Sequence, residues 1–307
     1  MKMRIAVMGA GGVGGCLGAL LARAGNDVSL IARGEHLRAI QAKGLRLKQD
    51  DAEFTVHVPA TSNPAEVGRV ELVLYTVKTY HNAVAIPAIR PLVGPDTGVL
   101  ALQNGVECQL ELTAELGPGH AMPGAYWTAS SVESPGVIAS VGPTPRLSFG
   151  EEGGGTSPRA EGVKTALAAA GIEVQLSPDP LQVIWSKFVV LCSIAGTTSA
   201  ARTRIREFIQ YPEGLELFTT AMAEVDAVGR GKGVNLPDGL VERSVEFIKG
   251  FPDFQNSMHA DFENGRPTEL EALNGAVVRM GREIGLPTPV NEFIYAVLLP
   301  LKNGLPA

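Results

Sequence analysis

A glycine-rich segment near the N-terminus constrains the fold of this chain more than any other feature. Gly9, Ala10, Gly11, Gly12, Val13 and Gly14 match the pattern G-x-G-x-x-G, directly after the β-prone run Arg4–Met8. The three glycines of the pattern permit a tight turn, close approach of a pyrophosphate and close helix–strand contact. The following helix, expected over Gly12–Arg23, would direct backbone N–H groups at the phosphates. The segment therefore predicts a dinucleotide-binding turn, and a purely structural glycine turn is the alternative.

The first part of the chain alternates between short β-prone runs and helix-prone segments. Val70–Val77 and Gly98–Leu102 are continuous apolar runs, as expected of central parallel strands that are covered on both faces. Further strands are expected over Asp27–Ala32, Val137–Val141, Arg146–Gly150 and Ile172–Gln175, and a pair of strands joined near Asp50–Asp51 is expected over Gly44–Val58. Helices are expected over Glu35–Lys43 and Ser157–Ala170. This alternation predicts an α/β fold with a Rossmann-type, doubly wound sheet.

The pattern changes at Ser177–Pro180, where Asp179 suits an N-cap and Pro180 suits the first turn of a helix. We therefore expect an NADP-binding domain over residues 1–178 and an all-helical substrate and catalytic domain over residues 179–307, with a hinge near residue 178. Helices are expected over residues 181–200, 212–230, 237–249, 267–284 and 289–302.

Composition excludes several classes of function. The net charge is −6 and no dense basic run occurs, which argues against nucleic acid or a membrane surface as a partner. The three cysteines are far apart, which favours a reduced, cytoplasmic protein. The five histidines lack metal-ligand spacing, so no metal site is assigned. Residues 181–201 are long enough to cross a bilayer, but a lysine, a glycine and hydroxyl residues within them favour a buried helix.

Arg33 follows the second expected strand, where NAD-binding folds usually place an acidic residue that binds the adenosine ribose. An arginine at this position can pair with the 2′-phosphate of NADP, so the sequence favours NADPH. The alternative is a solvated surface arginine, with Glu35 binding the ribose.

Polar residues also follow two other expected strands. Lys78 comes after Val70–Val77, and Asn104 comes shortly after Gly98–Leu102. Ligands of open α/β sheets bind beyond the carboxyl ends of the strands. Lys78 and Asn104 are therefore candidates for contacts to the nicotinamide half of the cofactor or to the substrate, and ordinary loop residues are the alternative.

Lys187 is the only charged residue between Leu181 and Ala201. Such a charge must be paired, solvated in a cleft or kept for chemistry. A lysine ammonium can stabilise and protonate the oxygen of a ketone as a hydride adds to its carbon. Glu269, expected at the start of a later helix, is a candidate partner of Lys187. A structural Lys–Glu pair between two helices is the alternative.

One class of dehydrogenase can be excluded by its motif. Short-chain dehydrogenases use Tyr-x-x-x-Lys, and none of the five tyrosines has a lysine four residues later. The chain instead resembles the ketopantoate reductase (2-dehydropantoate 2-reductase) family over nearly its whole length. The resemblance rests on GAGGVG at 9–14, VKTY at 77–80, QNG at 103–105, WSKF at 185–188 and SMHADFENGRPTELEALNG at 257–275.

The resemblance implies a role for each matching residue. It makes Lys187 the proton donor and implies that Glu269 contacts the nicotinamide ribose and helps to order the site. It also implies that Asn104 binds the cofactor, that Lys78 lies in the cleft and that Ser257 binds the substrate carboxylate. NADPH is the cofactor that the family implies, in agreement with Arg33.

The chain departs from the family at the substrate positions. Members that reduce ketopantoate carry asparagines four and eight residues after the catalytic lysine, where this chain has Leu191 and Ala195. An asparagine shortly before the serine is also missing, and Asn256 or Gln255 are the candidates to replace it. Unmatched polar groups cost about 1–3 kcal/mol each, so these changes favour a less hydroxylated 2-oxo acid.

The sequence thus predicts an NADPH-dependent reductase of a small-molecule 2-oxo acid, of the type that converts ketopantoate to pantoate. Two alternatives remain: a paralogue that reduces a different 2-oxo acid or an imine, and a sensor that binds NADPH without turnover. The apolar C-terminal helices, such as Glu292–Leu301, fit either a core position or a homodimer interface.

Overall fold

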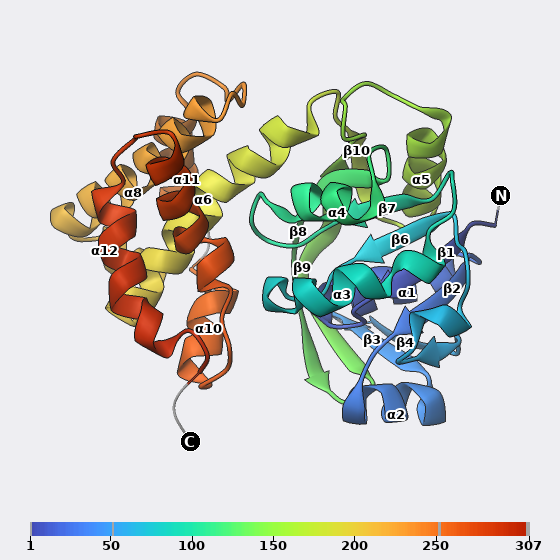
Figure 1. The fold of residues 1–307 in the computed structure, drawn as a ribbon. Helices are drawn as coiled ribbons and strands as arrows, with labels where there is room; N and C mark the ends of the chain where they lie inside the picture. The colour runs from blue at the N-terminus through green and yellow to red at the C-terminus, as the bar shows by residue number, and fades with distance from the viewer. Residues whose placement is uncertain (1, 51, 251–252, 305–307) are drawn as a thin grey trace. The chain divides into compact units, whose positions relative to one another are not determined.

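Apolar strands from the first part of the chain build one large sheet (Figure 1). The computed structural model describes residues 2–50, 52–250 and 253–304. The sheet has ten strands in the order β4-β3-β9-β8-β7-β6-β1-β2-β5, and β10 pairs with β9. The strands are β1 (Arg4–Met8), β2 (Asp27–Ile31), β3 (Leu45–Gln49), β4 (Ala52–Val56), β5 (Ala60–Thr61), β6 (Leu72–Tyr75), β7 (Gly98–Ala101), β8 (Ala121–Ser134), β9 (Val137–Phe149) and β10 (Glu173–Leu176).

Strand order reverses next to β1. Strand β1 pairs in parallel with β2 on one side and with β6 on the other, and β7 and β8 continue the parallel sheet beyond β6. Successive chain segments therefore extend the sheet first in one direction and then in the other. Such a topological switch point is where open α/β sheets bind their ligands.

Both faces of the central strands are covered by helices. Alternate residues of β1 point to opposite sides, with Ile5 and Val7 in one core and Ala6 and Met8 in the other. The first core includes residues of α1 (Gly12–Arg23) and α5 (Pro158–Ala169), and the second includes residues of α3 (Asn82–Ala88) and α4 (Cys108–Leu116). The remaining helices of this unit are α2 (Gly34–Lys43) and the short 3-10 helices η1 (Pro64–Glu66), η2 (Thr79–His81) and η3 (Arg90–Leu92). The expectation of a doubly wound α/β sheet is confirmed.

Two details of the sheet differ from expectation. The sequence predicts separate strands over residues 137–141 and 146–150, but a single strand, β9, runs from Val137 to Phe149. Strand β8 is not predicted, because it contains Pro123 and Gly124 and lacks a continuous apolar run. Strand β8 is held by long antiparallel pairing with β9 and by parallel pairing with β7, and neither contact can be read from local residue preference.

The second unit is helical. The chain divides into one unit of residues up to Gln103 and Cys108–Pro180, and another that holds Asn104–Glu107 and begins again at Leu181. The expected domain boundary near residue 178 stays a prediction, and Asn104–Glu107 groups with the helical unit although it follows β7. The helices are α6 (Pro180–Ala201), α7 (Ile205–Ile209), α8 (Pro212–Gly231), α9 (Leu240–Gly250), α10 (Ser257–Glu263), η4 (Leu270–Ala272), α11 (Asn274–Glu283), α12 (Pro289–Leu298) and η5 (Leu299–Leu301).

The helix expected over residues 267–284 is wrong in its first part. Thr268 and Glu269 precede the short 3-10 helix η4, and α11 starts at Asn274. Leu273 separates η4 from α11 because its backbone, with φ −104° and ψ −104°, is not helical. Glu269 therefore lies in an irregular segment and not at the start of a regular helix.

Helix α6 is long and apolar enough, by length and composition, to cross a membrane. In the structure, however, 67% of its most apolar stretch of 18 residues is buried inside the protein, as in the core helix of a globular domain. Trp185 and Phe188 of α6 pack edge to face, with ring centroids 5.6 Å apart. Gly229 of α8 fits closely against Trp185, since a Cβ there would lie 2.8 Å from the indole ring.

A buried polar network joins three helices of the second unit. The Glu224 side chain of α8 accepts hydrogen bonds from the backbone N–H groups of Val290 and Asn291, each at 2.9 Å, and from Asn291 Nδ2 at 2.7 Å. Asn274 of α11 donates from Nδ2 to Asn291 Oδ1 at 2.9 Å. The carboxylate thus lies at the N-terminus of α12, where the helix dipole favours a negative charge.

Replacement of Glu224 by alanine should destabilise the helical unit. The change leaves buried N–H groups without an acceptor, so we expect the free energy of unfolding to fall by about 2–4 kcal/mol. The measurement is the thermal midpoint by circular dichroism, which should drop by several degrees. Glu292→Ala is the control, because that side chain lies in the first turn of α12, the helix whose N-terminus Glu224 contacts, and is 43% exposed. Equal midpoints for the two variants would contradict the role given to Glu224.

Candidate active site

The glycine-rich turn lies at the carboxyl end of β1, at the switch point. The backbone N–H groups of Gly9 and Ala10 donate to Ile31 O at the end of β2, at 3.2 and 3.1 Å. On the other side, Thr76 Oγ1 donates to Gly9 O at 2.8 Å. The turn is therefore anchored to the ends of both strands that flank β1.

Close packing requires glycine at positions 9 and 14 of the turn, whereas the space next to Gly11 is open. Gly9 has φ +101°, and a Cβ there would lie 2.9 Å from Val77 N. A Cβ at Gly14 would lie 2.2 Å from Gly9 O, which explains how α1 approaches β1 so closely. By contrast, a Cβ at Gly11 would meet no atom within 4 Å. The open side of the turn is thus at Gly11, where the motif places the pyrophosphate.

The turn therefore fits the phosphates of a dinucleotide. Helix α1 begins at Gly12, and no acidic residue lies in its first turn. Its first N–H groups have no helical acceptors and can donate to an anion. The chemistry of this donor set, together with the space at Gly11, supports the assignment of residues 9–14 to cofactor binding.

Arg33 lies at the N-cap of α2, just beyond the end of β2, and its side chain is exposed. Glu35, the alternative ribose ligand, forms an ion pair with Arg38 instead. The Arg38 guanidinium lowers the pKa of the Glu35 carboxyl. Arg33 thus lies just beyond the end of β2 with an exposed side chain, while Glu35 is paired with Arg38.

His36 is a residue of this region that sequence reasoning missed. Its Nδ1 accepts from the Gly136 N–H at 3.0 Å, so its Nε2 carries the proton and donates to Ala10 O at 2.8 Å. One imidazole thus joins α2, the glycine-rich turn and the turn between β8 and β9. No local sequence signal indicates this role, because His36 and Gly136 are 100 positions apart.

Lys78 follows the end of β6 directly after Val77, whose side chain packs against Gly9. It is half-buried and forms the N-cap of η2. From the end of β7, Gln103 Nε2 donates to Val77 O at 2.6 Å and so holds this strand end in place. Lys78 therefore lies at the same sheet edge as the glycine-rich turn, as the strand pattern predicts.

Lys187 lies on α6 in the helical unit, together with two other candidate residues. Its Nζ donates to Asn104 Oδ1 at 3.1 Å. Burial lowers the pKa of Lys187 from 10.5 to about 8, and the negative charge of Glu269 opposes this shift. Glu269 is itself only 5% exposed. The structure thus brings together Lys187, Asn104 and Glu269 from segments that are far apart in the sequence.

This arrangement is suited to proton donation. Desolvation makes the ammonium a stronger acid, while the Glu269 charge favours its protonated form. A pKa near the working pH combines a populated acid with an effective proton transfer. Asn104 also fixes one of the N–H directions of the ammonium.

The predicted substrate residues are more scattered. Ser257 is exposed and begins α10. Asn256 is buried, and its side chain caps α10 by accepting from the Met258 N–H at 2.8 Å, so it is already used in the fold. Leu191 is half-buried and Ala195 is fully buried, and both lie on α6 beyond Lys187. The helix face that carries Lys187 therefore continues as an apolar surface.

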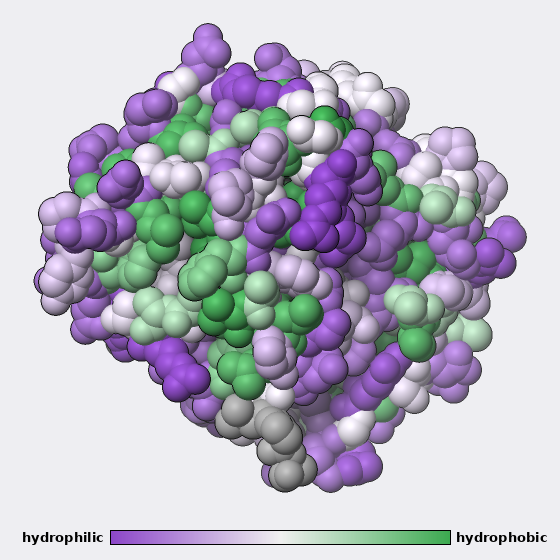
Figure 2. Space-filling model, turned by 60° about the vertical axis from the view of Figure 1, so that its left-hand side comes forward, coloured by the Kyte–Doolittle hydropathy of each residue, from purple (hydrophilic) through white to green (hydrophobic). Residues whose placement is uncertain are grey.

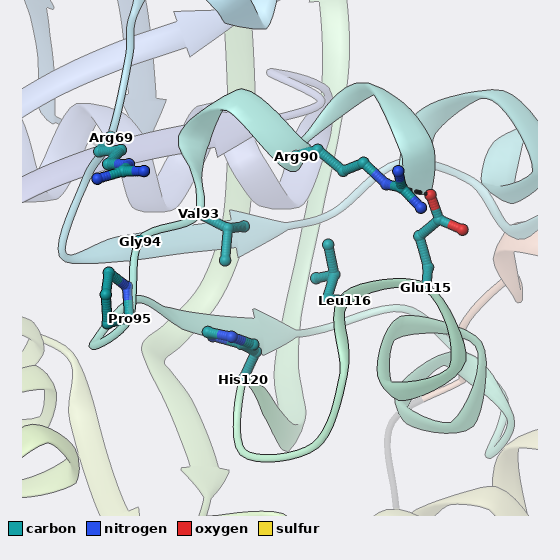
Figure 3. Close-up of a pocket in the computed structure, with 8 residues that line it drawn as sticks. All are labelled: Arg69, Arg90, Val93, Gly94, Pro95, Glu115, Leu116 and His120. Carbon is teal, nitrogen blue, oxygen red and sulfur yellow. Dashed lines mark ion pairs between the residues drawn. The ribbon is translucent and has the colours of Figure 1, made fainter.

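A cavity of about 360 Å³ lies elsewhere on the first unit (Figure 3). It is found at the amino ends of β7 and β8, the edge opposite to the glycine-rich turn. Arg90 reaches to Glu115 across one side of it, at 2.7 Å. Its lining consists of Arg69, Arg90, Val93, Gly94, Pro95, Glu115, Leu116 and His120. None of the candidate residues lines it, so it is not part of the candidate active site.

Comparison with known proteins agrees with this geometry. The chain matches the family model described as ketopantoate reductase PanE/ApbA over residues 5–153, and the model of its C-terminal part over residues 179–302. It is 34% identical to a 2-dehydropantoate 2-reductase of Mesorhizobium japonicum, over 96% of this chain and 97% of that protein. It is 32% identical to a 2-dehydropantoate 2-reductase of Mycobacterium tuberculosis, over 99% of each chain.

The fold is similar to that of a solved relative as well. The crystal structure of a PanE/ApbA family ketopantoate reductase from Ralstonia eutropha JMP134 superposes with a TM-score of 0.90, at 30% identity and over 98% of each chain. The family models, the curated relatives and the solved structure thus agree over both units. The chain therefore belongs to the ketopantoate reductase PanE/ApbA family and is an oxidoreductase that acts on a CH–OH group.

Proposed function

We propose that the protein is an NADPH-dependent reductase of a 2-oxo acid, of the kind that converts ketopantoate to pantoate, with Lys187 as the proton donor. The observation that carries this proposal is the placement of Lys187 at 3.1 Å from Asn104 and within the field of Glu269. The similarity to enzymes named 2-dehydropantoate 2-reductase supports the same reaction.

The chemistry follows from the residues of the site. When bound, NADPH supplies the hydride that adds to the carbonyl carbon. Residues 9–14 hold its phosphates, and Arg33, Lys78, Asn104 and Glu269 are the proposed further contacts. Lys187 stabilises the negative charge that grows on the carbonyl oxygen and transfers a proton from Nζ to that oxygen. Ser257 is the proposed ligand of the substrate carboxylate, together with Lys187 and Asn104 at the reacting end of the substrate.

A second candidate function is the reduction of a 2-oxo acid that is less polar than ketopantoate. The apolar side chains of Leu191 and Ala195 favour such a substrate. At these positions a member that reduces ketopantoate would present amide groups to the substrate. An aliphatic surface binds a hydroxyl group less well, because nothing replaces the hydrogen bonds that the hydroxyl makes in water.

We also propose a cytoplasmic location and a homodimer. The three cysteines are free and buried, as in proteins of a reducing compartment.

The homodimer is proposed from exposed apolar side chains. Phe293 and Val297 of α12 are 63% and 47% exposed and lie four residues apart on one face. Hydrophobic residues gather on the side of the molecule that Figure 2 brings forward, where the helices at the left of Figure 1 lie. Sedimentation of the purified protein tests the dimer.

Lys187→Ala should lower kcat by at least about a hundredfold, the usual contribution of a general acid. In the unaltered protein the ammonium can donate below pH 8 and loses its proton above it. The rate of reduction should therefore fall as the pH rises through about 8, and the rate of the reverse oxidation should rise. Initial rates measured across pH check both statements. Lys249→Ala, an exposed lysine paired with Glu246, is the control. Near-normal turnover of the Lys187 variant would exclude its proposed role.

Arg33→Ala should raise the KM for NADPH by about ten- to a hundredfold, the cost of losing charged hydrogen bonds to a phosphate. The KM for NADH should change little, because NADH lacks the 2′-phosphate. Steady-state kinetics with both cofactors make the measurement. Arg38→Ala is the matched control, because that guanidinium is already paired with Glu35. Equal use of NADH and NADPH by the unaltered protein would contradict the preference.

Substrate choice can be tested with a matched pair of acids. Trimethylpyruvate is ketopantoate without its hydroxyl group, so the ratio of their kcat/KM values isolates recognition of that hydroxyl. We expect the unaltered protein to favour trimethylpyruvate or to show little preference. Leu191→Asn should shift the ratio toward ketopantoate by about tenfold or more. A strong preference of the unaltered protein for ketopantoate would show that other groups bind the hydroxyl.

A further inference from the structure

The segment Asn104–Glu107 connects β7 to α4 and yet belongs to the helical unit by its contacts. Asn104 accepts the hydrogen bond from Lys187. The position of this segment therefore sets where Lys187 finds its acceptor Asn104. Two further contacts, one at Gly105 and one at Glu107, help to hold the segment in place.

The first contact is a close backbone approach. Gly105 has φ +98°, and a Cβ at this position would lie 3.0 Å from Ala272 O in η4. A side chain at position 105 would therefore press against η4, which directly follows Glu269. The loop that carries Asn104 thus packs against the segment that carries Glu269.

The second contact is an ion pair. Arg279 of α11 donates from Nη2 to Glu107 Oε2 at 2.8 Å. The other amino group of the same guanidinium, Nη1, donates to Glu271 O at 3.1 Å. Arg279 thus bridges the end of the Asn104 loop and the middle of η4.

Glu271 is held in turn by groups near the C-terminus. Its carboxylate accepts from Lys302 Nζ at 2.7 Å and from the Tyr295 hydroxyl at 3.0 and 3.1 Å. Burial raises the pKa of Glu271, but the bonds to Lys302 and Tyr295 outweigh this effect, so the net shift is downward. The charged carboxylate fixes η4, and therefore the carbonyl to which Arg279 binds.

We propose that Arg279 is a positioning residue that acts through Glu107 to keep Asn104 within hydrogen-bond distance of Lys187. The proposal rests on the proposed role of Lys187 as proton donor. Exposed ion pairs are individually weak, and Arg279 and Glu107 are 47% and 32% exposed. The expected effect on turnover is therefore moderate, because the loop would lose one of its anchors and keep the packing of Gly105.

Arg279→Gln and Glu107→Gln should each lower kcat by about three- to tenfold, with a smaller change in the KM for NADPH. If the two residues act as a pair, the double variant should be no slower than the slower single variant. Arg279→Lys, which keeps a charge that can reach Glu107, should recover part of the rate. Arg282→Gln is the matched control, because Arg282 lies on the same helix and pairs with Glu292 at 3.3 Å on the surface.

The pH profile separates positioning from a direct charge effect. Removal of a positive charge by Arg279→Gln would raise the pKa of Lys187, and removal of a negative charge by Glu107→Gln would lower it. Arg279 and Glu107 are 47% and 32% exposed, so solvent screens these charge effects. Loss of the Asn104 acceptor, whose bond favours the ammonium form, lowers the pKa of Lys187 in both variants. The positioning role therefore predicts that the descending limb of kcat moves to lower pH in both single variants. Shifts in opposite directions, or none, would overturn the proposal.

The outcomes also distinguish this inference from the proposed function. If Lys187→Ala keeps both the rate and the descending limb, the role of Lys187 fails. If Lys187→Ala is inactive while Arg279→Gln and Glu107→Gln match the unaltered protein, the positioning role alone fails. The thermal midpoint of each variant shows whether it is folded. If one of the two glutamine variants does not fold, the other glutamine variant and Arg279→Lys still decide between these outcomes.

Discussion

One ammonium group in a mostly apolar helix must be compensated by other groups of the second unit. Water no longer solvates Lys187 fully, so its charged form loses stability unless other groups replace that solvation. Glu269 supplies an opposite charge, and Asn104 supplies a hydrogen-bond acceptor. The balance leaves the lysine near pKa 8, between a permanently charged side chain and one that is neutral at physiological pH. A purely structural ion pair would also need both Lys187 and Glu269. It would not, however, need a lysine pKa as low as about 8.

The first unit depends on a different constraint, which is the close approach of α1 to β1. The atoms around Gly9 and Gly14 leave no room for a side chain, whereas the space at Gly11 is open. Packing thus explains two glycines of the motif, and the third lies at the open space where the proposed cofactor phosphates would bind. Because β2 and β6 anchor the turn on either side, the donors at the start of α1 are held in place before any anion arrives. This preorganisation lowers the cost of binding phosphates.

Local patterns in the sequence predicted the elements that are covered on both faces or that carry clear helix signals, such as β1, β6, α1 and α6. They failed where distant contacts decide the structure. Strand β8 contains residues that weaken a local strand prediction, and its pairing with β9 and β7 overrides them. His36 and Arg279 were missed because each acts on residues about a hundred or more positions away. The prediction that placed Lys187 beside Glu269 came from the chemistry of a buried charge and from family resemblance, because periodicity alone gives no partner.

The proposed reaction and the proposed choice of substrate depend on separate parts of α6. Proton donation as proposed uses Lys187, its acceptor Asn104 and the charge of Glu269, and the contacts of Lys187 with these two residues do not involve Leu191 or Ala195. A change of amide to aliphatic side chains one and two turns further along the helix alters the surface offered to the substrate and leaves the Asn104 contact intact. Such a change costs little in folding, because apolar side chains suit a helix that is mainly buried. The proposed catalytic lysine can therefore stay in place while substitutions in the neighbouring turns of the same helix change the proposed choice of 2-oxo acid.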